Sequence, residues 1–319
     1  MTRTTPPRPV DIAELFPELR EHSAMATRLH PRPGAPTAAD SSVGGPLLWP
    51  ADEPWPVCTD GAAHYIHALR SPATVRRSRE IYAAARGRAF TEEERAQLPR
   101  HDFSEPHHLV AQPIPFVPVA QLYRRDMPDF AGPDGADVLQ VLWCPLDHPE
   151  DNYTPRVRLY WRRSADVVAP LETPPEPPVV NDAYLPVACV VHPERVREYE
   201  YDGLLPEEVC ERIAAWEKDD GPSYAGDLSL APGFKVGGFA SWSLSLSEPM
   251  NCAECGAAMT LLFTVDSAEW DRDQPSWRPL EEPADASAVF TEVVIGRGYS
   301  LYVFRCPASF GHPPATAME

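Results

Sequence analysis

Cysteine and histidine residues near the end of the chain have the spacing of a metal site. Cys252 and Cys255 form a C-x-x-C pair, which lets two thiolates bind one tetrahedral ion from a tight turn. Gly256 follows and suits the positive φ that such turns require. Cys306 and His312 lie beyond a later strand-like segment and complete a Cys₃His set. We therefore predict a structural zinc site at these four cysteine and histidine residues.

Two other interpretations of this motif remain open. A redox C-x-x-C begins a helix, because the helix end lowers the pKa of the thiol. Here residues 259–263 have the composition of a strand instead. The cysteines could also be ordinary buried or surface thiols.

A second set of potential zinc ligands lies in the first half of the chain. It consists of Cys58, Cys144 and His148, with either His64 or His67 as the fourth ligand. The alternative is a pair of inert cysteines near surface histidines.

The two sets belong to a repeated pattern, which indicates an internal duplication. Residues 43–45 and 236–238 both read Val-Gly-Gly, and a tryptophan follows four residues later in each half. The strand-like segments 138–145 and 300–307 both end in Cys-Pro, with a histidine just beyond. Because these features recur in the same order, we infer that the halves share one fold.

Local patterns predict the elements that position these residues. Residues 71–103, extra to the first half, read as a helical insertion, in which Thr91 and Glu94 match a capping box. A second helix is expected over 204–219, with Val209, Ile213 and Trp216 on a core-facing side. Residues 171–180 predict an extended proline-rich connector, and further strands are expected over 116–123, 259–265 and 289–295.

Together these patterns predict an α+β, β-rich fold with two pseudo-duplicated sheet lobes and few helices. We divide the chain into an N-terminal segment (1–39), a first repeat lobe (40–150) with an insertion at about 71–103, a connector with a helix (151–231) and a second repeat lobe (232–319). Proline is abundant, at 39 of 319 residues, and so favours turns over long helices.

Composition limits the partners. The net charge of −19 disfavours nucleic acid and anionic membranes, whose phosphates attract Lys and Arg, and favours a basic protein or peptide. No signal peptide or apolar span is visible, so we expect a cytoplasmic protein. In that reducing compartment the 7 cysteines favour thiols or metal ligands over disulfides.

The same segments carry a resemblance to a known family. SSVGGPLLWPADEPWP (41–56), FVPVAQLYRRD (116–126), LQVLWCPLDH (139–148) and GRGYSLYVFRCP (296–307) resemble the bacterial YwqG-like family, a domain of unknown function common in actinobacteria. The second half is also remotely similar to eukaryotic programmed-cell-death-2-like proteins, which have a duplicated β-rich body with cysteine knuckles and escort a new ribosomal protein. This chain lacks their further cysteine clusters. The resemblance implies the fold and the zinc.

No catalytic motif of the G-x-S-x-G, Walker or H-E-x-x-H type is visible. We therefore predict a zinc-stabilised protein-binding module, chaperone-like or immunity-like toward a basic client, with no assigned catalytic or cofactor-binding residue. The alternative is a metal-dependent hydrolase, which needs an open coordination position on its metal. A third hypothesis is redox sensing through Cys252 and Cys255.

Overall fold

The fold was analysed in a computed structural model of the chain. The structure describes residues 2–59, 64, 70–99, 112–128, 131–218, 221–245, 249–273 and 275–319. Within these ranges no helix has both the length and the apolar character needed to cross a membrane.

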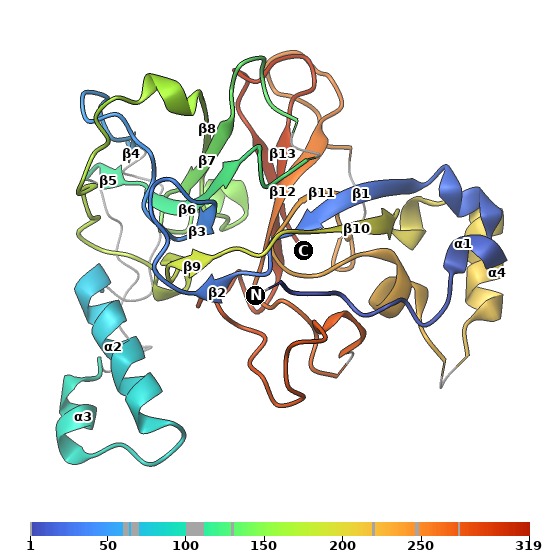
Figure 1. Ribbon diagram of the computed structural model, residues 1–319, viewed down its shortest axis with the longest axis horizontal. Coiled ribbons are helices and arrows are strands. Elements are labelled where there is room, and N and C mark those ends of the chain that lie inside the picture. The colour runs from blue at the N-terminus through green and yellow to red at the C-terminus, as the bar shows by residue number, and fades with distance from the viewer. Residues whose placement is uncertain are drawn as a thin grey trace.

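Two antiparallel six-stranded sheets dominate the structure (Figure 1). Sheet A has the order β10-β1-β11-β12-β13-β14, with β10 at Glu194–Tyr199, β1 at Ser23–Arg28, β11 at Lys235–Gly237, β12 at Thr260–Asp266, β13 at Ser300–Arg305 and β14 at Ala315–Met318. Sheet B has the order β2-β9-β3-β6-β7-β8, with β2 at Arg32–Pro33, β9 at Cys189–Val190, β3 at Ser42–Val43, β6 at Val117–Tyr123, β7 at Val138–Trp143 and β8 at Val157–Arg162. A small third sheet pairs β4 (Val57–Cys58) with β5 (Ile114–Pro115). The predicted β-rich α+β class is confirmed.

The two sheets repeat the same strand plan. β3, β6, β7 and β8 in sheet B occupy the places of β11, β12, β13 and β14 in sheet A. The residue pairing repeats as well. Ser42 lies opposite Gln121 in sheet B, and at the equivalent positions of sheet A Lys235 lies opposite Thr264. Even a register shift recurs in the β6–β7 and β12–β13 pairs.

Two continuous segments join the sheets by contributing a strand to each. The first runs from β1 in sheet A into β2 in sheet B, and the second runs from β9 in sheet B into β10 in sheet A. The two segments lie antiparallel to each other across both sheets. The segment 1–39 and the connector 151–231 thus supply strands to both sheets, so the sheets are not confined to the two repeats.

The inner faces of the sheets share one hydrophobic core. Strand residues alternate between two faces, and Leu139 and Val141 of sheet B belong to the same buried cluster as Phe263 and Val303 of sheet A. The outer faces are covered separately, by a cluster around Trp49 in sheet B and one around Trp242 in sheet A. Each sheet therefore depends on the other for one of its faces.

The helices lie outside the sheets, α2 and α3 on one side and α1 and α4 on the other (Figure 1). They span α1 (Ile12–Leu15), α2 (Pro72–Ala85), α3 (Glu92–Gln97) and α4 (Glu207–Trp216). The predicted helical insertion is confirmed by α2 and α3, including the capping box of Thr91 and Glu94. The helix predicted over 204–219 is confirmed by α4, whose Val209 and Ile213 are buried and whose Trp216 packs against the same cluster.

The strand predicted over 289–295 is wrong. These residues form a loop in which Glu292 has a φ of 57°, a value outside the β region. The loop hydrogen-bonds to another segment, since Thr291 accepts from the Val187 N–H and Val294 donates to the Ala183 carbonyl. Val293 and Ile295 are nevertheless buried in the shared core, which explains the apolar composition that suggested a strand.

The arginines of the insertion are largely paired within the chain. Arg76 contacts Glu176, Arg77 contacts Glu80 and Arg88 contacts Glu94. Arg79 donates to backbone carbonyls of Leu185, Asp182 and Glu292. The insertion therefore does not present a purely basic surface.

Candidate metal centres

The second-half ligands lie on two turns at one end of sheet A. Cys252 and Cys255 belong to the loop before β12, while Cys306 and His312 follow β13. The Gly256 N–H donates to the Cys252 carbonyl at 2.8 Å, and Gly256 has the positive φ, 72°, that the motif predicts. The C-x-x-C segment is a tight turn that leads into a strand, the local structure typical of zinc knuckles rather than of redox motifs.

The first-half ligands form the equivalent cluster beside sheet B. Cys58 belongs to β4, His64 follows it, and Cys144 and His148 lie just after β7. All four side chains are buried. Among the described residues His64 is the fourth member of this cluster, and the alternative ligand His67 lies outside them.

The separations within each cluster fit one tetrahedral ion. Zn–S bonds of about 2.3 Å and Zn–N bonds of about 2.0–2.1 Å place sulfur and nitrogen roughly 3.5 Å apart, and two sulfurs roughly 3.8 Å apart. The Cys58 Sγ lies 3.2 Å from the His64 Nε2 and 3.5 Å from the His148 Nε2.

The remaining distances agree with the same geometry. The Cys144 Sγ lies 3.5 Å from the His64 Nε2, the Cys252 Sγ lies 3.4 Å from the His312 Nδ1, and the Cys255 Sγ lies 3.5 Å from the Cys306 Sγ. In each set all four ligand atoms lie within 4.8 Å of one another. Both sets could hold a metal ion.

The electrostatics of the first cluster also suit a cation. The hydrogen bond from the Cys144 thiol, with those from His148 and His64, lowers the pKa of Cys58 to about 3. Burial and the neighbouring Cys58 thiolate raise the pKa of Cys144 far above its ordinary value. Without a cation the pocket therefore stabilises one thiolate only. A divalent ion would supply the positive charge that two adjacent thiolates need.

Backbone N–H groups support the thiolate after each Cys-Pro. The Leu146 N–H donates to the Cys144 sulfur, and the Ala308 N–H donates to the Cys306 sulfur at the equivalent position. Burial opposes ionisation of Cys306, but this donor, the Ser309 N–H and the thiols of Cys255 and Cys252 together lower its pKa. The duplication therefore preserves the environment of the ligand as well as its identity.

The two cysteines without counterparts lie outside both clusters. Cys189 is buried in the shared core and Cys210 is half-buried on α4. They therefore offer natural controls for the metal-site cysteines.

Sequence reasoning missed two other polar sites. His30 is buried between carboxylates, with its Nδ1 2.5 Å from Glu269 and its Nε2 3.1 Å from Glu194. Lys235 and Glu198 form a second buried pair, 2.6 Å apart. No spacing signal could have linked either set, because their members come from different strands and loops.

No protein-family model and no curated protein matches this chain. The resemblance to YwqG-like proteins therefore stays a prediction. The geometry of the two clusters is the basis for assigning a function.

Proposed function

We propose that the protein is a zinc-stabilised binding protein, in which two structural zinc ions fasten loops over the ends of the sheets and a sheet edge receives a basic protein or peptide. The observation that carries this proposal is the pair of equivalent four-ligand clusters. Cys₂His₂ and Cys₃His sets are the ligands of closed structural zinc sites. Each ion would join the turn before one strand to the turn after its neighbour.

The number of ligands in each cluster argues against the metal-dependent hydrolase. A catalytic zinc keeps three protein ligands and an open position for water. Here the fourth position of each cluster is supplied by the chain, through His64 in one case and His312 in the other. Redox sensing has similarly little support, because Cys252 and Cys255 lie in the turn before strand β12 and not at the start of a helix.

The edge of sheet A offers a place for the client. Among the described strands β14 pairs only with β13, and its four residues are half-buried. Ser300 and Glu319 exchange both backbone hydrogen bonds. Because bonded and non-bonded pairs alternate along an antiparallel ladder, the N–H groups of Thr316 and Met318 point away from β13. An extended peptide could pair with this edge by β-augmentation.

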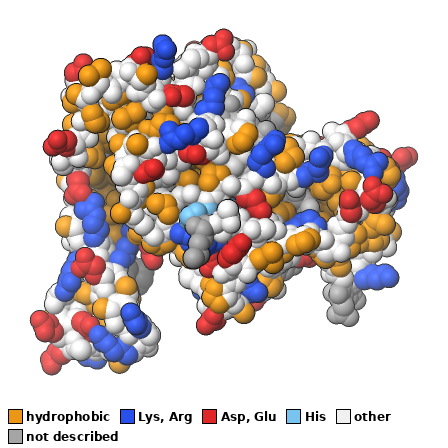
Figure 2. Space-filling view, in the orientation of Figure 1, with side chains coloured by type: hydrophobic (Ala, Val, Ile, Leu, Met, Phe, Trp, Pro, Cys, Tyr) orange, Lys and Arg blue, Asp and Glu red, His pale blue; other side chains and the backbone are white. Residues whose placement is uncertain are grey.

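The charge of the chain favours a basic client for that edge. Acidic and basic side chains are interspersed over the face seen in Figure 2, but the total charge is −19. This field would accelerate encounter with a cationic partner and would be screened by salt.

Elemental analysis of protein purified without added metal tests the zinc proposal. We expect two zinc ions per chain, one lost in Cys144→Ser and the other in Cys252→Ser, each with a fall in Tm. Cys210→Ser is the matched control and should keep both ions, because Cys210 lies outside the clusters. A wild-type chain without zinc, or with another metal, would overturn this assignment.

The binding proposal is tested by affinity capture from extracts at low and high salt, with the captured protein then purified and titrated. We expect one basic partner whose affinity falls with salt and is lost in Thr316→Pro. Proline removes the outward N–H without breaking a bond to β13. Thr316→Ala keeps that N–H and should bind normally. A partner equally retained by both variants would refute binding at this edge.

A further inference from the structure

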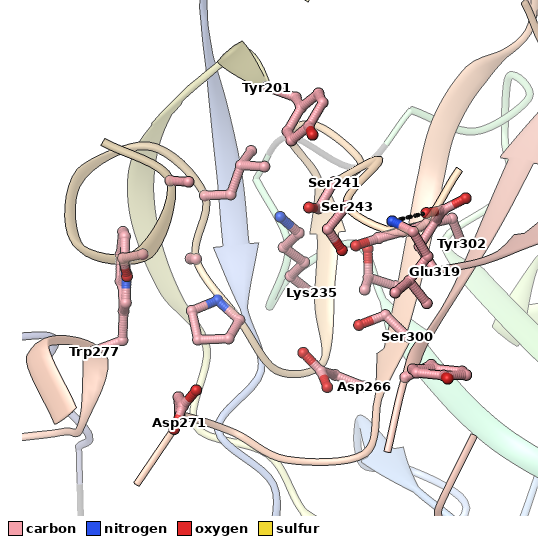
Figure 3. A pocket seen from close by; sticks show the side chains of 18 of the residues that line it. Tyr201, Lys235, Ser241, Ser243, Asp266, Asp271, Trp277, Ser300, Tyr302 and Glu319 are labelled. Carbon is pink, nitrogen blue, oxygen red and sulfur yellow. Dashed lines mark hydrogen bonds between the residues drawn. The ribbon is translucent and has the colours of Figure 1, made fainter. Parts of the chain in front are cut away.

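A polar cavity of about 320 Å³ opens on the outer face of sheet A. Its floor is formed by side chains that alternate with those of the shared core, among them Lys235, Thr264 and Tyr302. In Figure 3 the Lys235 side chain lies near the middle, with Ser243, Tyr302 and Glu319 on one side and Trp277 on the other. None of its lining residues belongs to a metal cluster.

The duplication provides an internal comparison for this cavity. Strand pairing places Gln121, Gln140 and Tyr160 of sheet B in one row. That row is filled by its own half, since the Gln121 Oε1 accepts from the Leu48 N–H at 2.7 Å and from the Gln140 Nε2 at 2.9 Å. Tyr160 in turn packs against Trp49, with ring centroids 4.8 Å apart.

The equivalent row of sheet A has different side chains. Thr264 stands opposite Lys235 and Tyr302, in the place of Gln121, and Ala317 stands opposite Tyr302, in the place of Tyr160. Both are shorter than their counterparts. Although Tyr302 is larger than Gln140, which it replaces, the row that sheet B closes with its own side chains lines a cavity in sheet A.

The open row contains polar groups with unused hydrogen-bonding capacity. The Thr264 side chain is 2% exposed, and its hydroxyl has no partner in the described part of the chain. The Lys235 Nζ donates to Glu198 at 2.6 Å and to the Phe239 carbonyl at 3.0 Å, which leaves its third hydrogen for the cavity. A buried hydroxyl without a partner is unfavourable, so the cavity favours an occupant that bonds to it.

The charges select the kind of occupant. The carboxylates of Asp266, Asp271 and Glu319 line the cavity and disfavour an anion. The ammonium of Lys235 on the cavity floor disfavours a cation next to it. The hydroxyls of Ser241, Ser300 and Tyr302 can each donate and accept.

We propose that this cavity is a binding site for a small neutral polyhydroxylated molecule, of the class of monosaccharides and cyclic polyols. Its hydroxyls would accept from Lys235 and donate to Asp266, and would exchange hydrogen bonds with Thr264 and the lining hydroxyls. The volume lies at the lower end of the roughly 300–1,000 Å³ typical of ligand pockets, which limits the ligand to a single ring.

Protein-detected NMR titration of the full, zinc-loaded chain tests the site, with D-glucose and myo-inositol as probes. We expect at least one to shift the signals of the lining residues saturably. Thr264→Gln should abolish binding, because it installs the side chain that fills the row in sheet B. Thr264→Val should weaken binding about tenfold, the effect of one lost hydrogen bond of about 1.4 kcal/mol. Ser300→Ala measures the effect on affinity of removing a second lining hydroxyl, at a less buried position.

Thr27→Val is the matched control. Thr27 is also a buried threonine without a hydroxyl partner in the described chain, but it does not line the cavity, so affinity should not change. Inorganic phosphate and methylammonium are the charged probes. The proposal is overturned if neither neutral probe binds, if a charged probe binds in preference, or if Thr27→Val weakens binding as much as Thr264→Val.

Discussion

At the scale of single residues, the ion pair between Lys235 and Glu198 is buried, with side-chain exposures of 3% and 0%. Glu198 is 0% exposed and also accepts from the Ala231 and Phe239 N–H groups. We expect Glu198→Ala to lower the free energy of unfolding by about 3–5 kcal/mol, because it leaves a buried ammonium uncompensated. Urea unfolding of the full chain measures this change.

An exposed ion pair supplies the control. Glu14 contacts Arg20 at 2.7 Å on the surface, where such pairs contribute about 0–1 kcal/mol. Glu14→Ala should therefore have little effect. Equal losses in the two variants would contradict the argument from burial.

Glu269 should make stability depend on acid pH. Burial raises its pKa, but the hydrogen bond and charge of His30 and the charges of Arg32 and Arg28 outweigh this and hold the pKa below 4.5. A carboxyl whose pKa is lowered by folding stabilises the protein above its ordinary pKa, and this contribution is lost as the pH falls toward the folded value.

Glu269→Gln lacks that contribution at every pH. We therefore expect the difference in unfolding free energy between wild type and variant to be largest near neutral pH and to shrink as the pH falls below 4.5. Unfolding curves at a series of pH values measure it, and protonation of the two metal clusters affects both proteins alike because Glu269 belongs to neither. A difference that stays constant with pH would show that the carboxylate charge is irrelevant.

At the scale of elements, the Val-Gly-Gly motif marks the point where the chain leaves β3 or β11. Gly44 and Gly237 have φ values of 63° and 71°, in the left-handed region that favours glycine. A Cβ on Gly44 would also lie 2.7 Å from the Val187 carbonyl oxygen. The first glycine of the motif recurs because both exits need a left-handed backbone at this position.

Gly44→Ala should therefore be more destabilising than Gly135→Ala. Gly135 has a φ of 82°, but nothing lies within 4 Å of its Cβ position, so it incurs only the conformational cost of roughly 1–2 kcal/mol. Thermal unfolding of the two variants compares them. Similar losses would mean that the contact with Val187 relaxes freely.

At the scale of the whole molecule, the two halves depend on each other because two continuous segments, β1–β2 and β9–β10, each contribute a strand to both sheets. Residues 232–319 contain β11 to β14 but lack β1 and β10, and they leave the inner face of sheet A uncovered. We expect this fragment to remain unfolded and the full chain to unfold in one cooperative transition. NMR dispersion and zinc content of the fragment are the measurements. A folded, zinc-loaded fragment would show that each repeat is autonomous.

The sequence by itself determined the local features. The duplication, the helices α2, α3 and α4, most of the long strands and the candidate ligands follow from short-range patterns such as the C-x-x-C turn and the capping box at Thr91. These signals are readable because caps, turns and alternation depend on residues close together in the chain. The same reasoning failed at 289–295, where burial produced an apolar segment without strand geometry.

Only the tertiary structure decided which distant residues meet. It placed His64 with Cys58, paired β1 with β10, and brought Lys235 beside Glu198. It also showed that the row closed by Gln121 in one sheet is open at Thr264 in the other. These outcomes depend on strand order and register, which long-range packing fixes and sequence spacing does not encode.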